Sequence, residues 1–350
     1  MERDGVRALL LTQVSDERWA TGFDGVFEDD PGVACLIGPS TAEAYADSRY
    51  VEAARSAAVG TSWSVREAAE PAAAGVEAAA GRGGTLALQP RLPWERYTRL
   101  ADAFGGEVVP ATGWLETARM VKDADEIARI EAAQEITDAA FEHVVRSIAP
   151  GVSEADLALE IEIFMRRSGA EGVAFPTIVA SGPNSSKPHA GVTARLLADG
   201  DLVKMDFGAL VGGYRADMTR TVVLGAASAR QRAMHDAVRE ANEAAIAACR
   251  AGVTGPQLHG VAVEVLERHG MADRFGHGLG HGVGLDVHEG PSIGPRSKDV
   301  LAAGMVVTIE PGVYEPGFGG VRIEDLVVVE EGGCRVLTRS TKALIEIAGR

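Results

Sequence analysis

The sequence predicts an α/β protein built from two domains. Its 350 residues give room for two units of ordinary size. Short apolar stretches and helix-forming segments fill about the first 120 residues, and from Asp123 a long helical pattern leads into a part that mixes helices with glycine-rich hairpins. We therefore expect an N-terminal domain over residues 1–120 and a C-terminal domain over residues 121–350.

The N-terminal domain contains apolar runs of strand length. Residues 7–13 (RALLLTQ), 32–37 (GVACLI) and 85–88 (TLAL) are expected to form strands. Residues 72–84 are rich in Ala and Gly and are expected to contain a loop. No cluster of residue types typical of catalysis occurs in this part of the sequence.

Helix starts are well marked in the C-terminal domain. Asp123 is a candidate N-cap with Glu126 at the capping-box position, and a helix of about 25 residues is expected to follow. Ser153 begins a second helix in the same way. Further helices are expected over residues 229–250 and 255–269.

Composition and charge exclude several classes of partner. The formal net charge is −16, which argues against nucleic acid because phosphate binding needs a basic face. The longest apolar runs fall far short of the roughly 20 residues that a membrane span requires. The three cysteines, Cys35, Cys249 and Cys334, are odd in number and widely spaced. They argue against a disulfide framework and for a reducing, cytoplasmic location.

Two carboxylates are brought together by the hairpin that residues 202–223 predict. The Gly212-Gly213 pair reads as its two-residue loop. Asp206 then lies opposite Thr219, and Asp217 is the diagonal neighbour of Asp206 on one face, roughly 7–8 Å away. Two carboxylates aimed at one point repel each other unless a positive charge lies between them. A metal ion is the simplest such charge.

A second hairpin repeats this arrangement. The segment that contains Glu310 runs through a glycine-rich turn centred near Gly317 into the segment that contains Glu324. The turn places Glu310 opposite Glu324. Four carboxylates are therefore expected to converge from two hairpins.

The nitrogen ligand is expected from residues 276–289, GHGLGHGVGLDVHE. His277 and His281 are four residues apart, but five glycines within nine residues exclude a helix. The glycines are better explained by a close approach of the backbone to a crowded site. One His and four carboxylates form a mostly oxygen donor set. This set favours two divalent ions, Mn²⁺ or Co²⁺, with Zn²⁺ or Fe²⁺ also possible.

Four motifs occur in order along the chain: DFG with D-x-TRT (206–221), GHGLGHGVGLDVHE, TIEPGVY (308–314) and GVRIED (320–325). Over residues 120–345 the sequence thereby resembles the creatinase, prolidase and aminopeptidase P family of metallopeptidases. WATGFDG (19–25) and ADSRYVEAA (46–54) extend the resemblance to the N-terminal domain. It implies a creatinase-like α/β N-terminal domain, a pita-bread α+β catalytic domain and a homodimer.

The resemblance also implies the site residues. The positions that match the family's five metal ligands are Asp206, Asp217, His281, Glu310 and Glu324. The positions that match its accessory site residues are His189, His277, His288 and Arg322. Among these, His189 and His288 are expected to stabilise the tetrahedral intermediate or to assist the leaving nitrogen.

The implied activity is removal of the N-terminal residue from peptides with a free N-terminus, at bonds that precede proline. Dipeptide-cleaving members of the family carry an H-E-x-P-R stretch, whereas here His288 is followed four residues later by Ser292. A terminal carboxylate next to the scissile bond needs a cation, which Ser does not supply. We therefore expect tripeptides and longer substrates, unless Arg322 or Arg296 takes that role.

Three alternative functions stay open at this point. They are an Xaa-Pro dipeptidase (prolidase), a hydrolase or lyase of a small non-peptide metabolite, and a non-catalytic peptide-binding protein. We further expect Lys204 to point away from Asp206, and Tyr214 and Tyr314 to belong to the core or to the site. The remaining histidines are expected on helix surfaces: His143, His235, His259 and His269.

Overall fold

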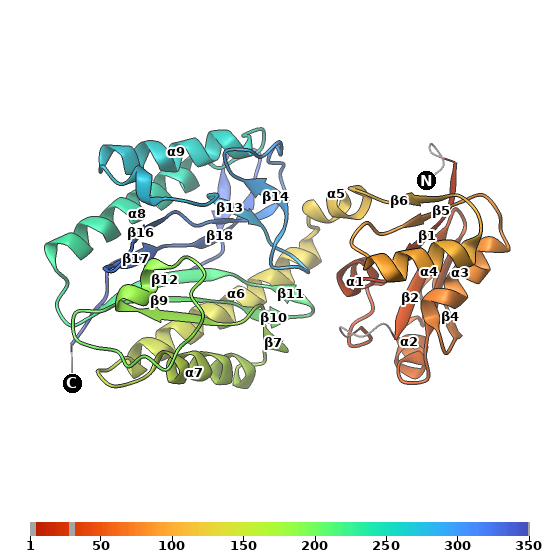
Figure 1. The fold of residues 1–350 in the computed structure, drawn as a ribbon, viewed down its shortest axis with the longest axis horizontal. Helices are drawn as coiled ribbons and strands as arrows, with labels where there is room; N and C mark the ends of the chain where they lie inside the picture. The colour runs from red at the N-terminus through yellow and green to blue at the C-terminus, as the bar shows by residue number, and fades with distance from the viewer. Residues whose placement is uncertain (1–4, 28–31, 349–350) are drawn as a thin grey trace. The chain divides into compact units, whose positions relative to one another are not determined.

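The computed structural model describes residues 5–27 and 32–348. The chain divides into two compact units, residues 1–118 and 119–350 (Figure 1). The division lies close to Val121, where the sequence places the boundary. Residues 1–4, 28–31 and 349–350 of the two expected domains lie outside the described residues.

A six-stranded sheet forms the centre of the N-terminal unit, with strand order β4-β3-β2-β1-β5-β6. Strand β1 pairs antiparallel with β2 and parallel with β5. The strands are β1 (Val6–Leu11), β2 (Val33–Gly38), β3 (Thr41–Ala46), β4 (Ser64–Glu67), β5 (Thr85–Leu88) and β6 (Val108–Pro110). The helices are α1 (Val14–Thr21), α2 (Val51–Ala57), α3 (Pro71–Ala80), α4 (Trp94–Phe104) and α5 (Trp114–Met120), the last of which runs across the division.

Both faces of this sheet are buried. Leu9 and Leu11 of β1 pack into one apolar cluster, and Ala8 and Leu10 pack into another. Successive side chains of a strand point to opposite faces, so burial on both faces explains why the expected strands appear as continuous apolar runs. The three strands expected over residues 7–13, 32–37 and 85–88 are confirmed as β1, β2 and β5.

The Ala/Gly-rich segment contains the expected loop only at its glycine-rich end, and the rest of it is helix. Residues 71–80 form α3, and only the glycine-rich end of the segment is irregular. Pro71 occupies the first turn, where its missing N–H costs no hydrogen bond. Alanine's high helix propensity thus outweighs the single internal Gly75.

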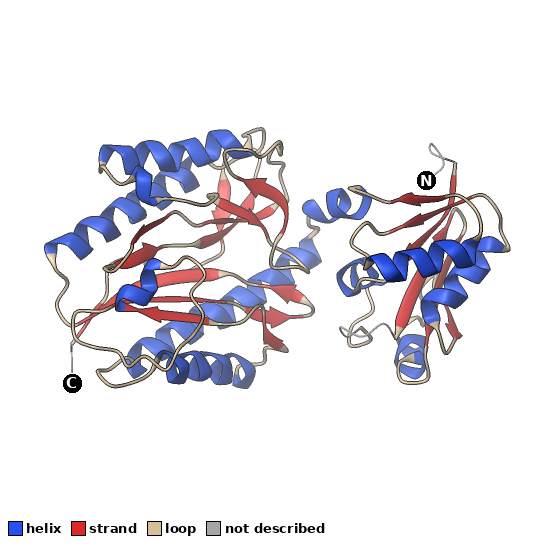
Figure 2. Ribbon diagram, in the orientation of Figure 1, coloured by secondary structure: helices blue, strands red, loops and turns tan. Residues whose placement is uncertain are grey.

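The C-terminal unit places sheets between two pairs of helices (Figure 2). Its helices are α6 (Ala124–Val144), α7 (Glu154–Arg167), α8 (Ala229–Ala248) and α9 (Gly255–Arg268), with 3-10 turns η2 (Val145–Ser147), η3 (Gly182–Ser186) and η4 (Ala272–Arg274). Its first strands are β7 (Gly172–Val173), β8 (Ile178–Ser181), β9 (Leu202–Phe207), β10 (Ala209–Val211), β11 (Tyr214–Arg215) and β12 (Met218–Leu224). The later strands are β13 (Gly280–Gly282), β14 (Glu289–Ile293), β15 (Val306–Ile309), β16 (Gly312–Glu315), β17 (Gly319–Arg322), β18 (Asp325–Val329), β19 (Cys334–Val336) and β20 (Glu346–Ile347).

Capping boxes start the four long helices of this unit. Asp123 caps α6 with Glu126 as its partner, and Ser153 caps α7, as the sequence predicts. The helices expected over residues 229–250 and 255–269 are confirmed as α8 and α9. The expected 25-residue helix is the 21 residues of α6 followed by η2. No helix in the described part of the chain combines the length and apolar character needed to cross a bilayer.

Strands β9 and β15 each have one apolar face and one polar face. Met205 of β9 packs into the cluster beneath α6 and α7, whereas Asp206 points to the other face. Val307 and Ile309 of β15 pack into the cluster beneath α8 and α9, whereas Thr308 points away from it. The polar positions of both sheets therefore lie on the faces turned away from the helices.

The first hairpin has the predicted register. Asp206 is paired with Thr219 across β9 and β12. The turn residues Gly212 and Gly213 have φ of 57° and 78°. Positive φ at both central residues is the requirement of the two-residue hairpin turn that the Gly-Gly pair predicts.

The second hairpin consists of two ladders in one register. Strand β15 pairs with β18 up to Ile309 opposite Asp325, and β16 pairs with β17 from Gly312 opposite Arg322. Glu310 and Glu324 occupy the interval between these ladders and stand opposite each other in the same register. Their backbones lie where the ladder opens, which leaves both side chains beside the polar face of β9.

Candidate metal centre

A cavity of about 820 Å³ in the C-terminal unit is lined by every residue that the sequence nominates. These are the five candidate ligands, Asp206, Asp217, His281, Glu310 and Glu324, and the four accessory residues, His189, His277, His288 and Arg322. Most of them come from strands or from segments directly adjacent to strands, whereas His189 lies in the irregular segment between η3 and β9. The rest of the lining is mostly apolar and comes mainly from α7 and from residues 175–178 and 188–192.

Three of the candidate ligands form a mutually close group. Asp217, His281 and Glu324 each offer one ligand atom, and these atoms lie within 4.8 Å of one another. His281 Nε2 is 3.7 Å from Asp217 Oδ2 and 3.3 Å from Glu310 Oε1. Asp206 differs, because its carboxylate forms an ion pair with Arg322.

The Thr308 hydroxyl on β15 and the backbone of β13 fix the orientation of His281. Its backbone N–H donates to Thr308 Oγ1 at 3.1 Å, and its Nδ1–H donates to the carbonyl of Gly282 at 3.1 Å. A proton on Nδ1 leaves Nε2 as a lone-pair donor that faces the carboxylates. This is the arrangement that holds a metal-binding histidine in its ligating tautomer.

Glycines on both sides of His281 allow the strand to sit at this depth. A Cβ added to Gly280 would lie 2.0 Å from the carbonyl oxygen of Thr308, and one added to Gly282 would lie 2.0 Å from that of Gly290. Neither contact can be relieved by a side-chain rotation because both involve backbone atoms. The predicted reason for the glycine-rich segment, close backbone approach to a crowded site, is confirmed at these two positions.

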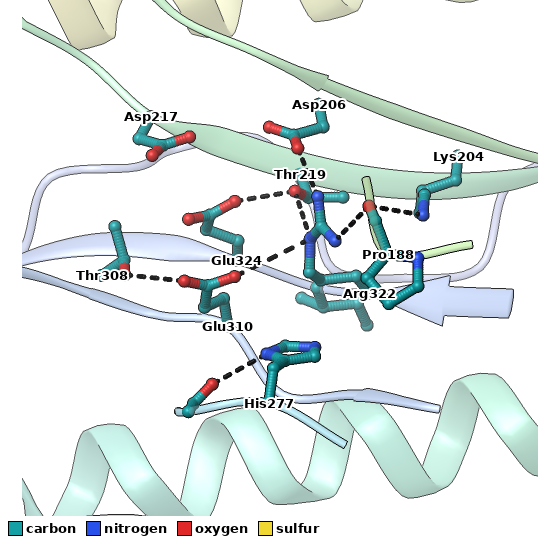
Figure 3. Close-up of polar contacts among 12 residues, drawn as sticks. Pro188, Lys204, Asp206, Asp217, Thr219, His277, Thr308, Glu310, Arg322 and Glu324 are labelled. Atoms are coloured by element: carbon teal, nitrogen blue, oxygen red, sulfur yellow. Dashed lines mark hydrogen bonds and ion pairs between the residues drawn. The ribbon is translucent and has the colours of Figure 1, made fainter. Parts of the chain in front are cut away.

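Arg322 connects the two hairpins (Figure 3). Its Nη2 is paired with Asp206, and its Nε donates to Thr219 Oγ1 at 2.8 Å. Thr219 in turn donates to Glu324 Oε2 at 2.7 Å. A single guanidinium and a single hydroxyl thus hold carboxylates from both hairpins in place.

The carboxylates of the site repel one another strongly. Burial raises the pKa of Asp217 well above its usual range, and the charges of Glu324 and Asp206 raise it further. Burial and the charge of Glu310 likewise raise the pKa of Glu324 to about 8. Burial also raises the pKa of Glu310, but the hydrogen bond and charge of His281 outweigh it and lower the pKa to about 2.

The carboxylates of the site carry more negative charge than their positively charged partners compensate. Arg322 compensates mainly Asp206, and His281 compensates mainly Glu310. The remaining repulsion is what divalent cations relieve. Carboxylate oxygens with one imidazole nitrogen are also the donor types that Mn²⁺, Co²⁺, Zn²⁺ and Fe²⁺ accept. The residues present therefore fit a metal centre.

The other three histidines border this centre. His277 Nε2 lies 2.9 Å from the hydroxyl of Tyr314, and its Nδ1–H donates to the carbonyl of Gly278 at 2.8 Å. The ring of His288 meets that of His281 edge-on, with centroids 4.3 Å apart. His189 lines the cavity, and no hydrogen bond to its ring is found within the described ranges. His189 and His288 line the cavity, whereas His277 is engaged with Tyr314.

The expectation that Lys204 points away from Asp206 is wrong. Residues two apart in a strand share a face, so Lys204 lies on the face that carries Asp206. Its ammonium donates to the carbonyls of Lys187 and Pro188 and lies 5.1 Å from the ring centre of Tyr314. Burial lowers the pKa of Lys204 to about 7.

One of the four helical histidines also departs from expectation. His235, on α8, is buried with 1% of its surface exposed, not on the surface. Burial lowers its pKa to about 4. It belongs to the packing of α8, because it lies on the same helix face as the buried residues Met234 and Val238.

Thr219 and Thr308 are parts of the site that the sequence did not predict. Thr219 orients Arg322 and Glu324, and Thr308 contacts His281 and Glu310. Tyr314, which the sequence leaves between core and site, contacts both His277 and Arg322. The pairing of Asp206 with Thr219 was a usable signal for the first of these, since cross-strand partners are neighbours.

Comparisons with known proteins agree with this geometry. Residues 128–331 match the profile of metallopeptidase family M24, and residues 1–121 match that of the creatinase/prolidase N-terminal domain. The chain is 36% identical over 349 residues to an uncharacterized peptidase of Bacillus subtilis, YqhT, covering 97% of this chain and 96% of that protein.

Two solved structures resemble the whole chain. An Xaa-Pro dipeptidase from Bacillus anthracis superposes with a TM-score of 0.93 at 36% identity, covering 99% of this chain and 96% of that one. An X-Pro aminopeptidase from Thermotoga maritima superposes with a TM-score of 0.88 at 36% identity, covering 99% of each chain. The predicted fold, a creatinase-like N-terminal domain followed by a pita-bread domain, is confirmed.

Proposed function

We propose that this chain, which belongs to metallopeptidase family M24 and is one of its Xaa-Pro peptidases, is an aminopeptidase that resembles aminopeptidase P. It removes the N-terminal residue from peptides whose second residue is proline. The observation that carries the proposal is the cavity that brings five ligand side chains together with three histidines and Arg322. An apolar wall on the remaining sides suits a proline ring.

The proposed metal ligands are Asp206, Asp217, His281, Glu310 and Glu324, which would hold two divalent ions, Mn²⁺ or Co²⁺ by preference. When bound, such ions polarise a carbonyl oxygen and lower the pKa of a coordinated water. The three closely spaced ligand atoms of Asp217, His281 and Glu324 support this assignment, as does the mutual repulsion of the carboxylates.

The chain's own residues are proposed to position the peptide and its protons. His189 and His288 face the cavity and are placed to donate hydrogen bonds to the oxyanion or a proton to the leaving nitrogen. Arg322 fixes the carboxylate of Asp206. His277 acts through Tyr314, whose hydroxyl donates to His277 Nε2 and accepts a hydrogen bond from Arg322 at 3.1 Å, and His277 is therefore a positioning residue.

Substrate length is proposed from Ser292. This residue replaces the Arg of the prolidase-like stretch, and it is exposed and outside the cavity lining. Arg296 is also exposed and outside the lining, and Arg322 is held by Asp206. No free cation of the described cavity lining is therefore available for a dipeptide's terminal carboxylate. Tripeptides and longer peptides avoid this requirement.

A direct test compares Ala-Pro with Ala-Pro-Ala. The chelator-treated protein should be inactive, and Mn²⁺ or Co²⁺ should restore hydrolysis with kcat/KM at least about tenfold higher for the tripeptide, since one unmatched buried charge costs more than 1.4 kcal/mol. Full activity without metal, verified by elemental analysis, would refute the metal centre. A tenfold preference for the dipeptide would make the protein a prolidase.

The second candidate function is Xaa-Pro dipeptidase, because the solved relative from Bacillus anthracis has that name. A hydrolase or lyase of a small non-peptide metabolite and a non-catalytic peptide-binding protein are the remaining alternatives. The same assay separates both from the two peptidases, because neither would hydrolyse the test peptides.

We further propose a cytoplasmic homodimer. The three free cysteines support the cytoplasm, and sedimentation equilibrium tests the dimer.

A further inference from the structure

One wall of the cavity is a single face of helix α7. Ala155, Ala158, Leu159 and Glu162 line the cavity, and their spacing of three, four and seven residues places them along one side of the helix. Two alanines keep the first part of this wall low, and Leu159 is apolar with 56% of its surface exposed. Glu162 follows one turn further and is the charged residue of the wall.

Glu162 differs from the other acids of α7 in having no partner in the described part of the chain. Glu154 accepts hydrogen bonds from Ser181 and Asn184, Asp156 belongs to the N-terminal capping box, and Glu160 lies 2.6 Å from His143. No ion pair or hydrogen bond of Glu162 is found among residues 5–27 and 32–348.

Glu162 is also the one carboxylate of the described cavity lining that lies outside the proposed metal centre. The apolar part of the same lining includes Phe175, Ile178 and Val192. A half-buried carboxylate beside apolar groups interacts with a cation more strongly than one in open water does. The single Arg of the lining, Arg322, is paired with Asp206.

We propose that Glu162 is a specificity-determining residue that binds the positively charged side chain of a basic residue of the substrate. The inference rests on the proposed function, since the cation is presented by a peptide held at the metal centre. Two residues of such a peptide can supply it, the one before the proline or the one after it. Both present the same chemistry, an ammonium or guanidinium group at the end of a flexible chain.

Four tripeptides test the proposal with the metal-loaded full-length protein. Lys-Pro-Ala against Met-Pro-Ala probes the residue before proline, and Ala-Pro-Lys against Ala-Pro-Met probes the residue after it. Met matches the length of Lys without its charge. In one of these pairs the wild-type kcat/KM should favour Lys by about 2- to 5-fold, the range expected for a partly exposed ion pair. The preference should shrink as NaCl is raised from 0.05 to 0.5 M.

Two variants assign the preference to this residue. Glu162→Gln should bring the Lys-to-Met ratio to about one. Glu162→Lys should instead favour Glu over Gln at the same substrate position. Glu142→Gln on α6, an exposed residue outside the cavity lining, is the matched control and should keep the wild-type ratio.

The outcomes separate this inference from the proposed function. Equal hydrolysis of the Lys and Met peptides by the wild-type protein, in both pairs, would overturn the role of Glu162 and leave the peptidase activity standing. A Lys preference that survives in Glu162→Gln would do the same. If none of the four peptides were hydrolysed, the proposed function would fall and this inference with it.

Discussion

Thr219 is a small side chain that decides the orientation of two large ones. Its hydroxyl accepts from Arg322 and donates to Glu324. A guanidinium can only donate and an ionised carboxylate can only accept, so the single proton of the Thr219 hydroxyl goes to Glu324. The direction of both hydrogen bonds is therefore fixed, and Glu324 keeps its other oxygen for a further partner.

The two histidines whose rings touch are expected to respond differently to removal. His281→Ala should lower the bound metal per chain, because it deletes a proposed ligand. His288→Ala should keep the metal and lower kcat roughly 10²-fold, because it deletes a proposed proton or hydrogen-bond donor. Elemental analysis and steady-state kinetics on Ala-Pro-Ala measure both effects. Normal turnover by His288→Ala would remove that residue from the mechanism.

Glu17 of α1 makes the stability of the N-terminal unit dependent on pH. Only 3% of its surface is exposed, and its Oε1 finds no hydrogen-bond partner among the described residues. Burial raises its pKa from 4.5 to about 8, with Arg96 opposing and Asp16 adding to the shift. Between these values the folded state holds a proton that the unfolded state has released, so the free energy of unfolding falls as the pH rises from about 4.5 to 8.

The corresponding variant is Glu17→Gln. Its free energy of unfolding should stay nearly constant from pH 5 to pH 8, while that of the wild type falls by on the order of 3 kcal/mol. All four tryptophans, Trp19, Trp63, Trp94 and Trp114, lie in the N-terminal unit, so urea unfolding followed by tryptophan fluorescence reports on that unit. The exposed Glu95→Gln is the control. Parallel pH profiles for the wild type and Glu17→Gln would contradict the assignment.

At the scale of elements, the hairpins were the most predictable part of the molecule. A Gly-Gly pair between alternating residues sets a two-residue turn, and the turn fixes every cross-strand partner, including Asp206 opposite Thr219. Capping boxes marked the starts of α6 and α7 for the same reason, since both depend on residues close in sequence. These local signals therefore predicted where the candidate ligands lie along the strands.

Contacts between distant segments could not be predicted in this way. The ion pair of Arg322 with Asp206 joins residues from different hairpins. Strand alternation alone places Lys204 on the face of Asp206, but its contact with the carbonyl of Pro188 depends on where a loop returns. The burial of His235 depends on the packing of α8. Such features follow from tertiary packing rather than from neighbouring residues.

A buried ion network ties the segment before α6 to β14. Glu289, the first residue of β14, accepts from Lys122 Nζ at 2.7 Å and from Arg119 Nη2 at 2.6 Å. All three side chains are at least nine-tenths buried. Removing one member of a buried network leaves uncompensated charge, which costs about 3 kcal/mol or more. Glu289 directly follows His288, so the network also holds a residue of the cavity.

The element-scale prediction is that Glu289→Ala weakens both stability and catalysis. The C-terminal unit should lose about 3 kcal/mol of unfolding free energy, and kcat should fall more than KM changes, because His288 is displaced rather than removed. Far-UV circular dichroism in urea and kinetics on Ala-Pro-Ala test this. The exposed Glu331→Ala should change neither. Unaltered stability of Glu289→Ala would show that the network contributes nothing measurable.

For the whole molecule, metal binding should stabilise one unit and not the other. The proposed ligands span residues 206–324 of the sequence and come together only when the C-terminal unit is folded. A metal at one hundred times its dissociation constant should therefore stabilise that unit by about 2.7 kcal/mol per site. Differential scanning calorimetry should show a raised transition, while tryptophan fluorescence, confined to the N-terminal unit, should move little. An equal shift in both signals would mean that the two units unfold together.

The glycines around His281 also define where this protein can be redesigned. Any side chain at Gly280 or Gly282 would collide with a backbone carbonyl, so libraries that vary the β13 strand would consist mostly of misfolded members. The α7 wall is different, because Ala155, Ala158 and Leu159 border open cavity and carry no proposed chemistry. Directed evolution toward new substrates should therefore begin on the helix and leave the strand untouched.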